Sequence, residues 1–340
     1  MKQRGYLIGG VVLLIAALGA VVFAAGTKPS DLGGGTAMGD RSTAPALAAK
    51  GWINTEPLTK ADLKDKVVLY DFWTYSCVNC VRTIPYIRSW YDAYGKDGLV
   101  IIGVHSPEFD FEKNHANVAK AVKKLGVDYP VALDDDMAIW NAFGNQYWPA
   151  DYLYNRAGHQ ASVHFGEGDY AKTENEIRKL LHVPASAPRA KVTSHEGGTD
   201  GSLDQTGETY NGSERGADGF ASPQPLDDGT RTYTAPADLQ SGQHALDGRW
   251  TISGQYVQSA APGASLVLRY QAGQANLVMS TASGEPIDVR VQVDSKAPTT
   301  VHVDAADLFT LATTHDSKPH TLRLTPASPG LRAFAFTFGG

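Results

Sequence analysis

The only two cysteines of the 340-residue chain, Cys77 and Cys80, are separated by two residues. They directly follow an apolar run at 66–73 and lie at the first turn of a helical pattern at 78–95. A thiol in the first turn of a helix faces unpaired backbone N–H groups and the positive end of the helix dipole, which favour the thiolate. We therefore predict that Cys77 is a nucleophile and that Cys80 attacks the mixed disulfide formed by Cys77. The chemistry expected is thiol-disulfide exchange.

Three other readings of the pair stay open. A structural disulfide here would close a loop of only two residues and would stabilise little. A zinc site needs four ligands, and no second Cys-x-x-Cys follows, although His105 and His115 could contribute. A peroxiredoxin-type peroxidase has a Thr ahead of its cysteine, as Thr74 is, but also a Pro where this chain has Tyr70. We expect no metal site and no cofactor other than the redox-active cysteine pair.

The region that surrounds the cysteines alternates short apolar runs with amphipathic stretches, which is typical of an α/β fold with a mostly parallel sheet. A hairpin is expected to turn at Ala157 and Gly158. The predicted strands are 66–73, 98–106 and 129–133, and the predicted helices are 78–95, 111–125, 137–144 and 172–181.

Beyond residue 206 the apolar period changes to two. The stretch 286–294 alternates apolar and polar residues, and Phe334, Phe336 and Phe338 alternate in the same way near the end. About seven such runs, separated by Gly, Pro and Asp, predict a jelly-roll-like β-sandwich. The runs are 248–254, 264–271, 275–281, 286–294, 299–305, 320–326 and 332–338.

The first residues combine Lys2 and Arg4 with an uncharged apolar run, which is about long enough to cross a bilayer. This predicts a single hydrophobic helix, either a signal-anchor or a signal peptide cut near Ala24. The rest of the chain is then extracytoplasmic, in the periplasm or cell envelope. The predicted parts are the leader 1–25, a flexible tether 26–49, a catalytic domain 50–183, a linker 184–206 and the β-sandwich 207–340.

The composition restricts the partners. The net charge is −6 and 42% of residues are hydrophobic, so the chain can bury a normal core. Lys and Arg are scattered along the sequence and form no basic stripe. Nucleic acid is therefore not an expected partner.

The segment YDFWTYSCVNCVRTIP, at 70–85, resembles the active-site segment of the thioredoxin superfamily. The stretches at 103–121, 145–159 and 163–174 resemble the extracytoplasmic part of DipZ-type thiol:disulfide proteins, which are related to TlpA and ResA. The ending LRAFAFTFG, at 331–339, is similar to the C-terminal β-sandwich of the DipZ type. The resemblance implies a thioredoxin fold followed by a β-sandwich.

The resemblance also implies roles for single residues. Asp71 would accept the proton of Cys80. Trp148 and Pro149 would form the cis-proline loop that faces the cysteines and binds an extended substrate segment. Pro85, inside the helix that carries the cysteines, is expected to kink it.

Four further residues are weaker candidates. Trp73 and Tyr75 border the thiols and are predicted to shape the substrate surface, although Trp73 is equally compatible with a core position. His105 and Glu108 follow the strand at 98–106 and could line the same edge of the sheet.

Taken together, these features indicate a membrane-tethered thiol-disulfide oxidoreductase that reduces disulfides in exported proteins, with apocytochrome c as one candidate. DipZ-type proteins carry a CcdA-like membrane domain, whereas this chain has one hydrophobic segment, so we expect electrons from a separate CcdA-like membrane protein. The rival functions are a thiol peroxidase and a cell-wall glycan-binding protein. In the second, Trp250, Tyr256 and Tyr270 would form a stacking face for carbohydrate.

Overall fold

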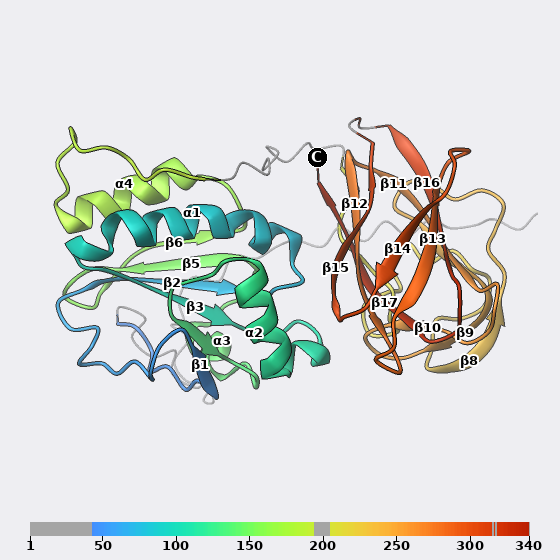
Figure 1. Ribbon diagram of the computed structural model, residues 1–340, viewed down its shortest axis with the longest axis horizontal. Coiled ribbons are helices and arrows are strands. Elements are labelled where there is room, and N and C mark those ends of the chain that lie inside the picture. Colours follow the sequence, from blue (N-terminus) through green and yellow to red (C-terminus); the bar gives the residue numbers. More distant parts are fainter. Residues whose placement is uncertain (1–42, 194–204, 315, 317, 340) are drawn as a thin grey trace, which may run out of the picture. The chain divides into compact units, whose positions relative to one another are not determined.

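The computed structural model describes residues 43–193, 205–314, 316 and 318–339 (Figure 1). The predicted leader and most of the predicted tether lie outside these residues, as does 194–204 of the predicted linker. Within the described ranges, no helix combines the length and the apolar character needed to cross a bilayer.

The first domain contains a six-stranded mixed sheet in the order β1-β4-β3-β2-β5-β6. The central strands β2, β3 and β4 are parallel, and the outer pairs are antiparallel, so the sheet is less parallel than predicted. Every residue of β2 is buried, which explains why all of them except Asp71 are apolar or aromatic. The strands are β1 Gly51–Ile53, β2 Val67–Trp73, β3 Leu99–His105, β4 Val131–Leu133, β5 Ala150–Tyr154 and β6 Gln160–Phe165.

Helices cover both faces of this sheet (Figure 1). Helices α1, α2 and α4 bury their apolar sides on one face, because the connections that run from β2 to β3 and from β3 to β4 step in the same direction. Helix α3 lies on the opposite face, where the chain returns from β4 to β5. The helices are α1 Val78–Tyr94, α2 His115–Lys124, α3 Ala138–Phe143 and α4 Tyr170–Leu181, with 3-10 helices η1 Gly95–Asp97 and η2 Asp110–Lys113. This is a thioredoxin fold, as predicted.

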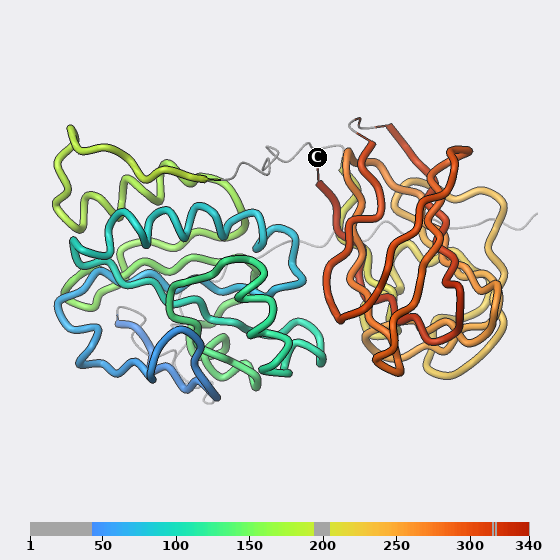
Figure 2. Tube along the Cα trace, in the orientation of Figure 1, coloured from blue at the N-terminus to red at the C-terminus, as the bar shows by residue number. Residues whose placement is uncertain are grey.

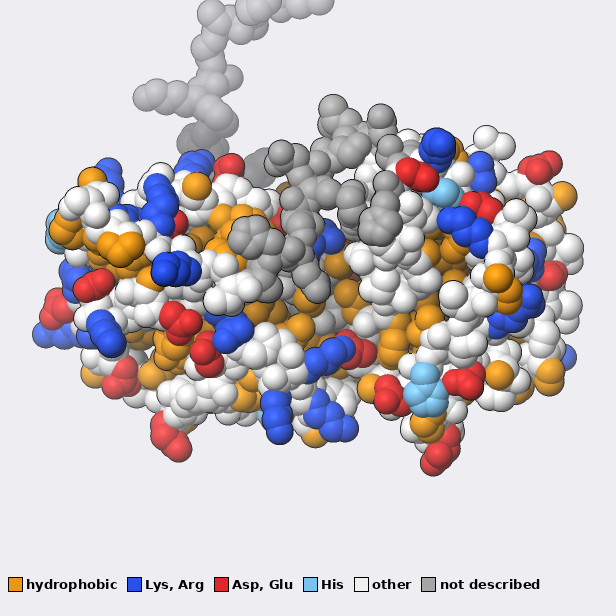
Figure 3. All heavy atoms as spheres, turned by 45° about the horizontal axis from the view of Figure 1, so that its top comes forward, with side chains coloured by type: hydrophobic (Ala, Val, Ile, Leu, Met, Phe, Trp, Pro, Cys, Tyr) orange, Lys and Arg blue, Asp and Glu red, His pale blue; other side chains and the backbone are white. Residues whose placement is uncertain are grey.

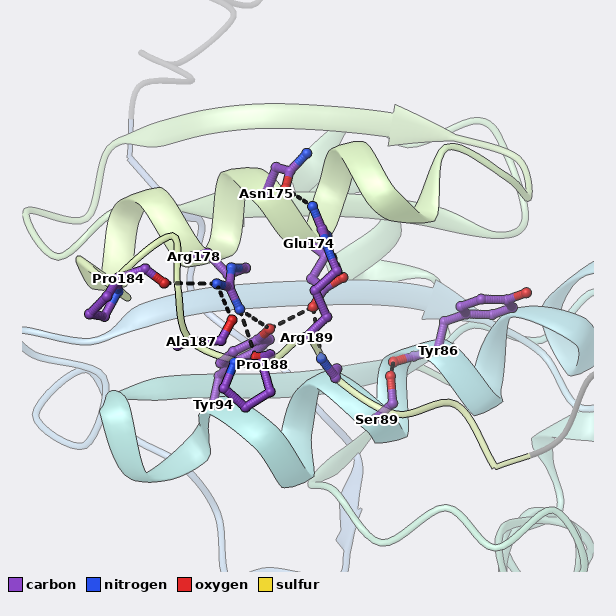
Figure 4. Close-up of polar contacts among 11 residues, drawn as sticks. Tyr86, Ser89, Tyr94, Glu174, Asn175, Arg178, Pro184, Ala187, Pro188 and Arg189 are labelled. Carbon is purple, nitrogen blue, oxygen red and sulfur yellow. Dashed lines mark hydrogen bonds and ion pairs between the residues drawn. The ribbon is translucent and has the colours of Figure 1, made fainter.

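The first part of the predicted linker is held against α4 (Figure 4). The buried guanidinium of Arg178 donates to the carbonyl oxygens of Pro184, Ala187 and Pro188, each at 2.9 Å. It also donates to the hydroxyl of Tyr94 on α1. Three backbone acceptors thus fix this segment to α4, and the bond to Tyr94 joins α4 to α1. These bonds are strong because their donor is charged.

The second domain is all β. Its strands follow one another in the order β14-β13-β16-β11-β9-β10-β17-β12-β15, and the apolar side chains of both halves meet in one core. The short strands β7, β8 and β10 and the strand β15 were not among the predicted runs. The strands are β7 Thr209–Tyr210, β8 Gly229–Tyr233, β9 His244–Ile252, β10 Val257–Ser259, β11 Ser265–Gln271, β12 Gln274–Thr281, β13 Ile287–Val293, β14 Thr299–Val303, β15 Asp307–Thr313, β16 Pro319–Pro326 and β17 Leu331–Gly339.

Strand β9 joins the two halves of this sandwich (Figure 2). Its first residues pair with β11, and its last residues pair with β8 and β10. Between them Gly248 has φ +82°, and a Cβ there would meet the Cα of Ala264 at 3.0 Å. Glycine is required at this position because both the left-handed conformation and the close backbone approach exclude a side chain.

The alternation predicted for the last strand is broken. Phe336 and Phe338 lie in the sandwich core, but Phe334 does not. A bulge shifts the register of β17 on β12 between Leu277 and Met279, so Phe334 turns to the opposite side. There its ring packs on Phe109, which follows β3 of the first domain, with ring centres 5.1 Å apart. The described residues of both domains belong to one compact unit.

The aromatic face expected to stack on carbohydrate is not formed. Trp250 and Tyr270 have no exposed surface and belong to the sandwich core. Tyr256 is half-buried, and its ring packs on Phe334 on one side and under Arg332 on the other. On the face shown in Figure 3, basic and acidic side chains are interspersed.

Candidate active site

The two cysteines lie at the start of α1. Cys77 is the N-cap residue, and the backbone N–H of Cys80 donates to its sulfur at 3.3 Å. Cys77 is partly exposed, whereas Cys80 is 1% exposed. Both thiols are free. The sulfur of Cys77 therefore occupies the position in which a helix N-terminus stabilises negative charge.

Cys77 opens into a cleft of about 400 Å³ that Trp148 also lines. The Trp148–Pro149 peptide bond is cis, which confirms the expectation from the resemblance. The indole N–H of Trp148 donates to the carbonyl oxygen of Ser106 at 3.0 Å, and its ring packs on Trp140. The cis-proline loop is thus anchored from behind and borders the exposed thiol.

The cleft has a second wall. Glu108 lines it and accepts hydrogen bonds from the hydroxyl of Tyr210 at 2.8 Å and from Arg215 at 2.7 Å. Glu208, also in this wall, has a carboxylate oxygen 2.7 Å from the same Tyr210 hydroxyl, and burial raises its pKa to about 7, helped by the charge of Glu108. Glu108 therefore borders the cleft as part of a polar cluster that the second domain completes.

Three residues that the sequence placed near the thiols, Trp73, Tyr75 and His105, are buried and do not reach the cleft surface. Trp73 and Tyr75 are 1% and 3% exposed, so neither shapes the substrate surface, and Trp73 takes the core position that was its alternative. His105 is fully buried and stacks on Tyr75. Burial lowers the pKa of His105 to about 3, so its ring is neutral. The side chains at these strand ends are covered because α1 and η2 close over them.

Asp71 is buried in the middle of β2 and is 1% exposed. Neither of its carboxylate oxygens has a hydrogen-bond partner among the described residues. Burial raises the pKa of Asp71 to about 7, and the nearby Tyr129 hydroxyl partly opposes this rise without reaching hydrogen-bond geometry. Burial, contact with the Cys77 thiol and the charge of Asp71 together raise the pKa of Cys80. The carboxylate and the buried thiol thus influence each other.

Pro85 lies inside α1, which continues to Tyr94. Its ring nitrogen has no hydrogen to donate to the carbonyl of Val81. The predicted kink at this residue stays a prediction.

One residue next to the cysteines was missed by the sequence reasoning. Glu112, in η2, is fully buried and binds the loop that precedes Cys77. Its carboxylate accepts from the hydroxyls of Thr74 and Ser76 at 2.5 and 2.7 Å. It also accepts from the backbone N–H groups of Glu108 and Phe109. Residues 108–113 contain three acidic residues, so nothing in the local sequence singles out Glu112 or reveals a partner almost forty residues earlier.

Glu112→Gln tests this anchor. The amide group has one acceptor oxygen and turns a donor towards groups that are themselves donors, so buried hydrogen bonds are lost. We expect the free energy of unfolding to fall by about 2–4 kcal/mol, together with disulfide reductase activity. Urea unfolding and an insulin reduction assay measure both. Asp110→Asn, in the same 3-10 helix but exposed, is the matched control and should change little; equal losses in both variants would contradict the anchor.

Within the described residues, no group of three or more His, Cys, Asp or Glu side chains is arranged as a metal site.

Each of the two domains matches the model of a known protein family. Residues 41–153 match the redoxin family model, and residues 206–339 match the family model of the thioredoxin-like C-terminal domain. The chain is 37% identical to Protein DipZ of Mycobacterium bovis over 338 residues, which cover 95% of this chain and 46% of that protein. It therefore spans about half the length of this curated relative.

Shorter relatives match the first domain. The thiol-disulfide oxidoreductase ResA of Bacillus subtilis is 28% identical over 183 residues, covering 54% of this chain and 94% of ResA. A solved structure of a thioredoxin-like protein in the oxidized form is 27% identical, covers 42% of this chain and 96% of its own, and has a TM-score of 0.39. The chain therefore combines a redoxin domain with a thioredoxin-like C-terminal domain.

Proposed function

We propose that the protein reduces disulfide bonds in other proteins through a dithiol-disulfide cycle of Cys77 and Cys80. The observation that carries this proposal is the arrangement of the two thiols. The sulfur of Cys77 caps α1 in a cleft beside the cis-proline loop, and Cys80 lies buried one turn further along the helix. An exposed nucleophile with a protected second thiol is the arrangement that thiol-disulfide exchange requires.

The cycle has two steps. The Cys77 thiolate attacks one sulfur of the substrate disulfide, forms a mixed disulfide and releases the other sulfur as a thiolate. Cys80 then loses its proton to Asp71 and attacks the sulfur of Cys77, so that the substrate's second thiolate leaves and the Cys77–Cys80 disulfide forms. Two electrons pass from the protein to the substrate.

The surroundings of Cys80 fit its role as the second thiol of the cycle. Burial and, after it, contact with the Cys77 thiol raise the pKa of Cys80, so this thiol stays protonated until a base takes its proton. The direction of electron flow depends on the stability of the dithiol form relative to the disulfide, which the redox potential measures.

The substrates that we propose are disulfide-containing exported proteins, with apocytochrome c as one candidate, and the electron donor is a CcdA-like membrane protein. The location that we propose is extracytoplasmic, with the N-terminal segment as the membrane anchor or as a cleaved signal. The similarity to DipZ and to the oxidoreductase ResA supports this assignment.

The equilibrium redox potential tests the direction. We expect a value below about −200 mV, in the range of thioredoxin-like reductants. The measurement is an equilibration of the full chain against glutathione buffers of known ratio, read from the fraction of free thiol. A potential above about −150 mV would favour an oxidase role instead.

A further inference from the structure

A second buried carboxylate lies opposite Asp71. Asp151 on β5 is the direct antiparallel partner of Asp71 on β2, so both side chains emerge on the same face of the sheet. Asp151 is 6% exposed, and its Oδ1 has no hydrogen-bond partner in the described part of the chain. Strands that are far apart in the sequence thus bring two uncompensated carboxyl groups together beneath the active-site helix.

The two carboxyl groups cannot both be charged near neutral pH. Burial and, after it, the charge of Asp71 raise the pKa of Asp151 well above its ordinary value. Carboxylates that face each other in an apolar site bind one proton between them, because two adjacent charges there have no solvation to offset their repulsion. The pair therefore holds a proton that can move from one member to the other.

Asp151 also reaches a cavity that Asp71 does not line. The cavity has a volume of about 30 Å³, enough for a water molecule, and lies between the sheet and α4. Its walls combine two apolar side chains of β2 and β5 with polar groups of β6 and α4. The lining residues are Leu69, Asp151, Leu153, Ser162, Val163, His164, Lys172, Thr173 and Glu176.

Both a buried and an exposed side chain line this cavity. His164 is the register partner of Asp151 on β6, and its buried Nε2 has no partner among the residues described. Lys172 on α4 lines the same cavity, and its side chain is 72% exposed. The titratable groups around the pair are Cys80 from α1, Tyr129 before β4, His164 from β6, and Lys172 and Glu176 from α4.

We propose that Asp151 is a positioning residue that passes the proton accepted by Asp71 from Cys80 through this cavity to solvent. The inference rests on the proposed function. When Cys80 gives its proton to the Asp71 carboxylate, its sulfur attacks Cys77 and the substrate thiolate leaves. The pair then holds two protons; Asp151 releases its own through the cavity to solvent and takes the other from Asp71, which restores the Asp71 carboxylate for the next cycle. The thiolate released with the substrate takes its own proton from solvent.

Asp151→Asn in the full chain tests the relay. A single-turnover assay with a fluorescent mixed-disulfide substrate separates attack by Cys77 from resolution by Cys80. We expect the first step to stay unchanged, the second to slow about tenfold at pH 7, and the pH midpoint of the second step to move by about one unit. Asp151→Glu should restore most of the rate.

The control is Leu153→Ala, which enlarges the same cavity without removing a titratable group. It should lower stability but leave the pH midpoint of resolution in place. The relay is wrong if Asp151→Asn folds and resolves with the wild-type rate and pH profile, or if Leu153→Ala moves the midpoint equally. If neither step depends on Cys77, the proposed function itself fails.

If Asp151→Asn does not fold, NMR titration of ¹³C-labelled aspartate in the wild-type chain decides the question. The relay predicts that Asp71 and Asp151 titrate together in two steps, each sensing the other. A carboxyl of Asp151 that titrates near 4, as an isolated aspartate does, would overturn it.

Discussion

Cys77→Ser abolishes disulfide reduction, with an expected loss of about a thousandfold or more, because a serine hydroxyl does not supply the anionic sulfur that attacks a disulfide. Cys77 is the thiol that borders the cleft, and Cys80 is 1% exposed, so the second thiol cannot take over as nucleophile. The measurement is the rate of insulin disulfide reduction by the full chain with dithiothreitol as the electron source.

Cys80→Ser should behave differently. It keeps the nucleophile and removes the resolving thiol, so a mixed disulfide with Cys77 accumulates. Non-reducing electrophoresis detects this adduct, and mass spectrometry of the trapped partner identifies the substrate in cell-envelope extracts. Thermal unfolding of both variants should match that of the wild type. A Cys77→Ser protein that still reduces insulin, or adducts that form through Cys80, would contradict the assignment of the nucleophile.

Asp71→Ala is expected to make the protein more stable and less active. The pKa of Asp71 is about 7 in the folded protein and 3.8 in its ordinary surroundings, so ionisation of the buried carboxyl opposes folding. This cost is fully present above pH 7, declines as the pH falls and is absent below about 4. About three pKa units correspond to roughly 4 kcal/mol at high pH.

Part of this gain is offset by the space that alanine leaves. We therefore expect Asp71→Ala to raise the free energy of unfolding by about 2–3 kcal/mol at pH 8, and this gain to shrink towards pH 4. Urea unfolding at several pH values gives the curve. Resolution by Cys80 should slow about tenfold or more at pH 7, because its proton acceptor is lost.

Asp92→Ala is the matched control for this prediction. Asp92 is an exposed carboxylate on α1, so its removal should change neither the stability nor the pH dependence appreciably. If the stability curves of the wild type and Asp71→Ala run parallel from pH 4 to pH 8, the pKa of Asp71 is not raised on folding, and the carboxylate does not carry the cost assigned to it. An Asp71 with an ordinary pKa would be a weak base for Cys80, and the proton acceptor would then have to be another group.

Short-range patterns predicted much of the fold. The strand that ends at Trp73 and the helix that follows it are in place within one residue, because a fully buried strand and a helix with an N-terminal cap have local signatures. The hairpin turned at Ala157 and Gly158 is also present, between β5 and β6. The cis bond before Pro149 came from the resemblance to a family, since the local sequence alone favours the trans form.

The exposure of aromatic side chains was predicted less well, because aromatic residues occur both in hydrophobic cores and on binding surfaces. Trp73 and Tyr75, next to the thiols, are buried, as are Trp250 and Tyr270 in the sandwich. Alternation predicts two faces of a strand, but it does not predict which face is covered. A bulge also reverses the alternation, as at Phe334, and depends on the partner strand.

The amino-acid sequence by itself determined the chemistry of this protein: a thiol pair placed at the start of a helix, in a chain with no other cysteines. Only the tertiary structure decided what surrounds that pair. Asp151 meets Asp71 because two strands from distant parts of the chain pair in one register, and Glu112 anchors the cysteine loop across a similar gap. Such contacts depend on three-dimensional packing, which no local pattern of residues encodes.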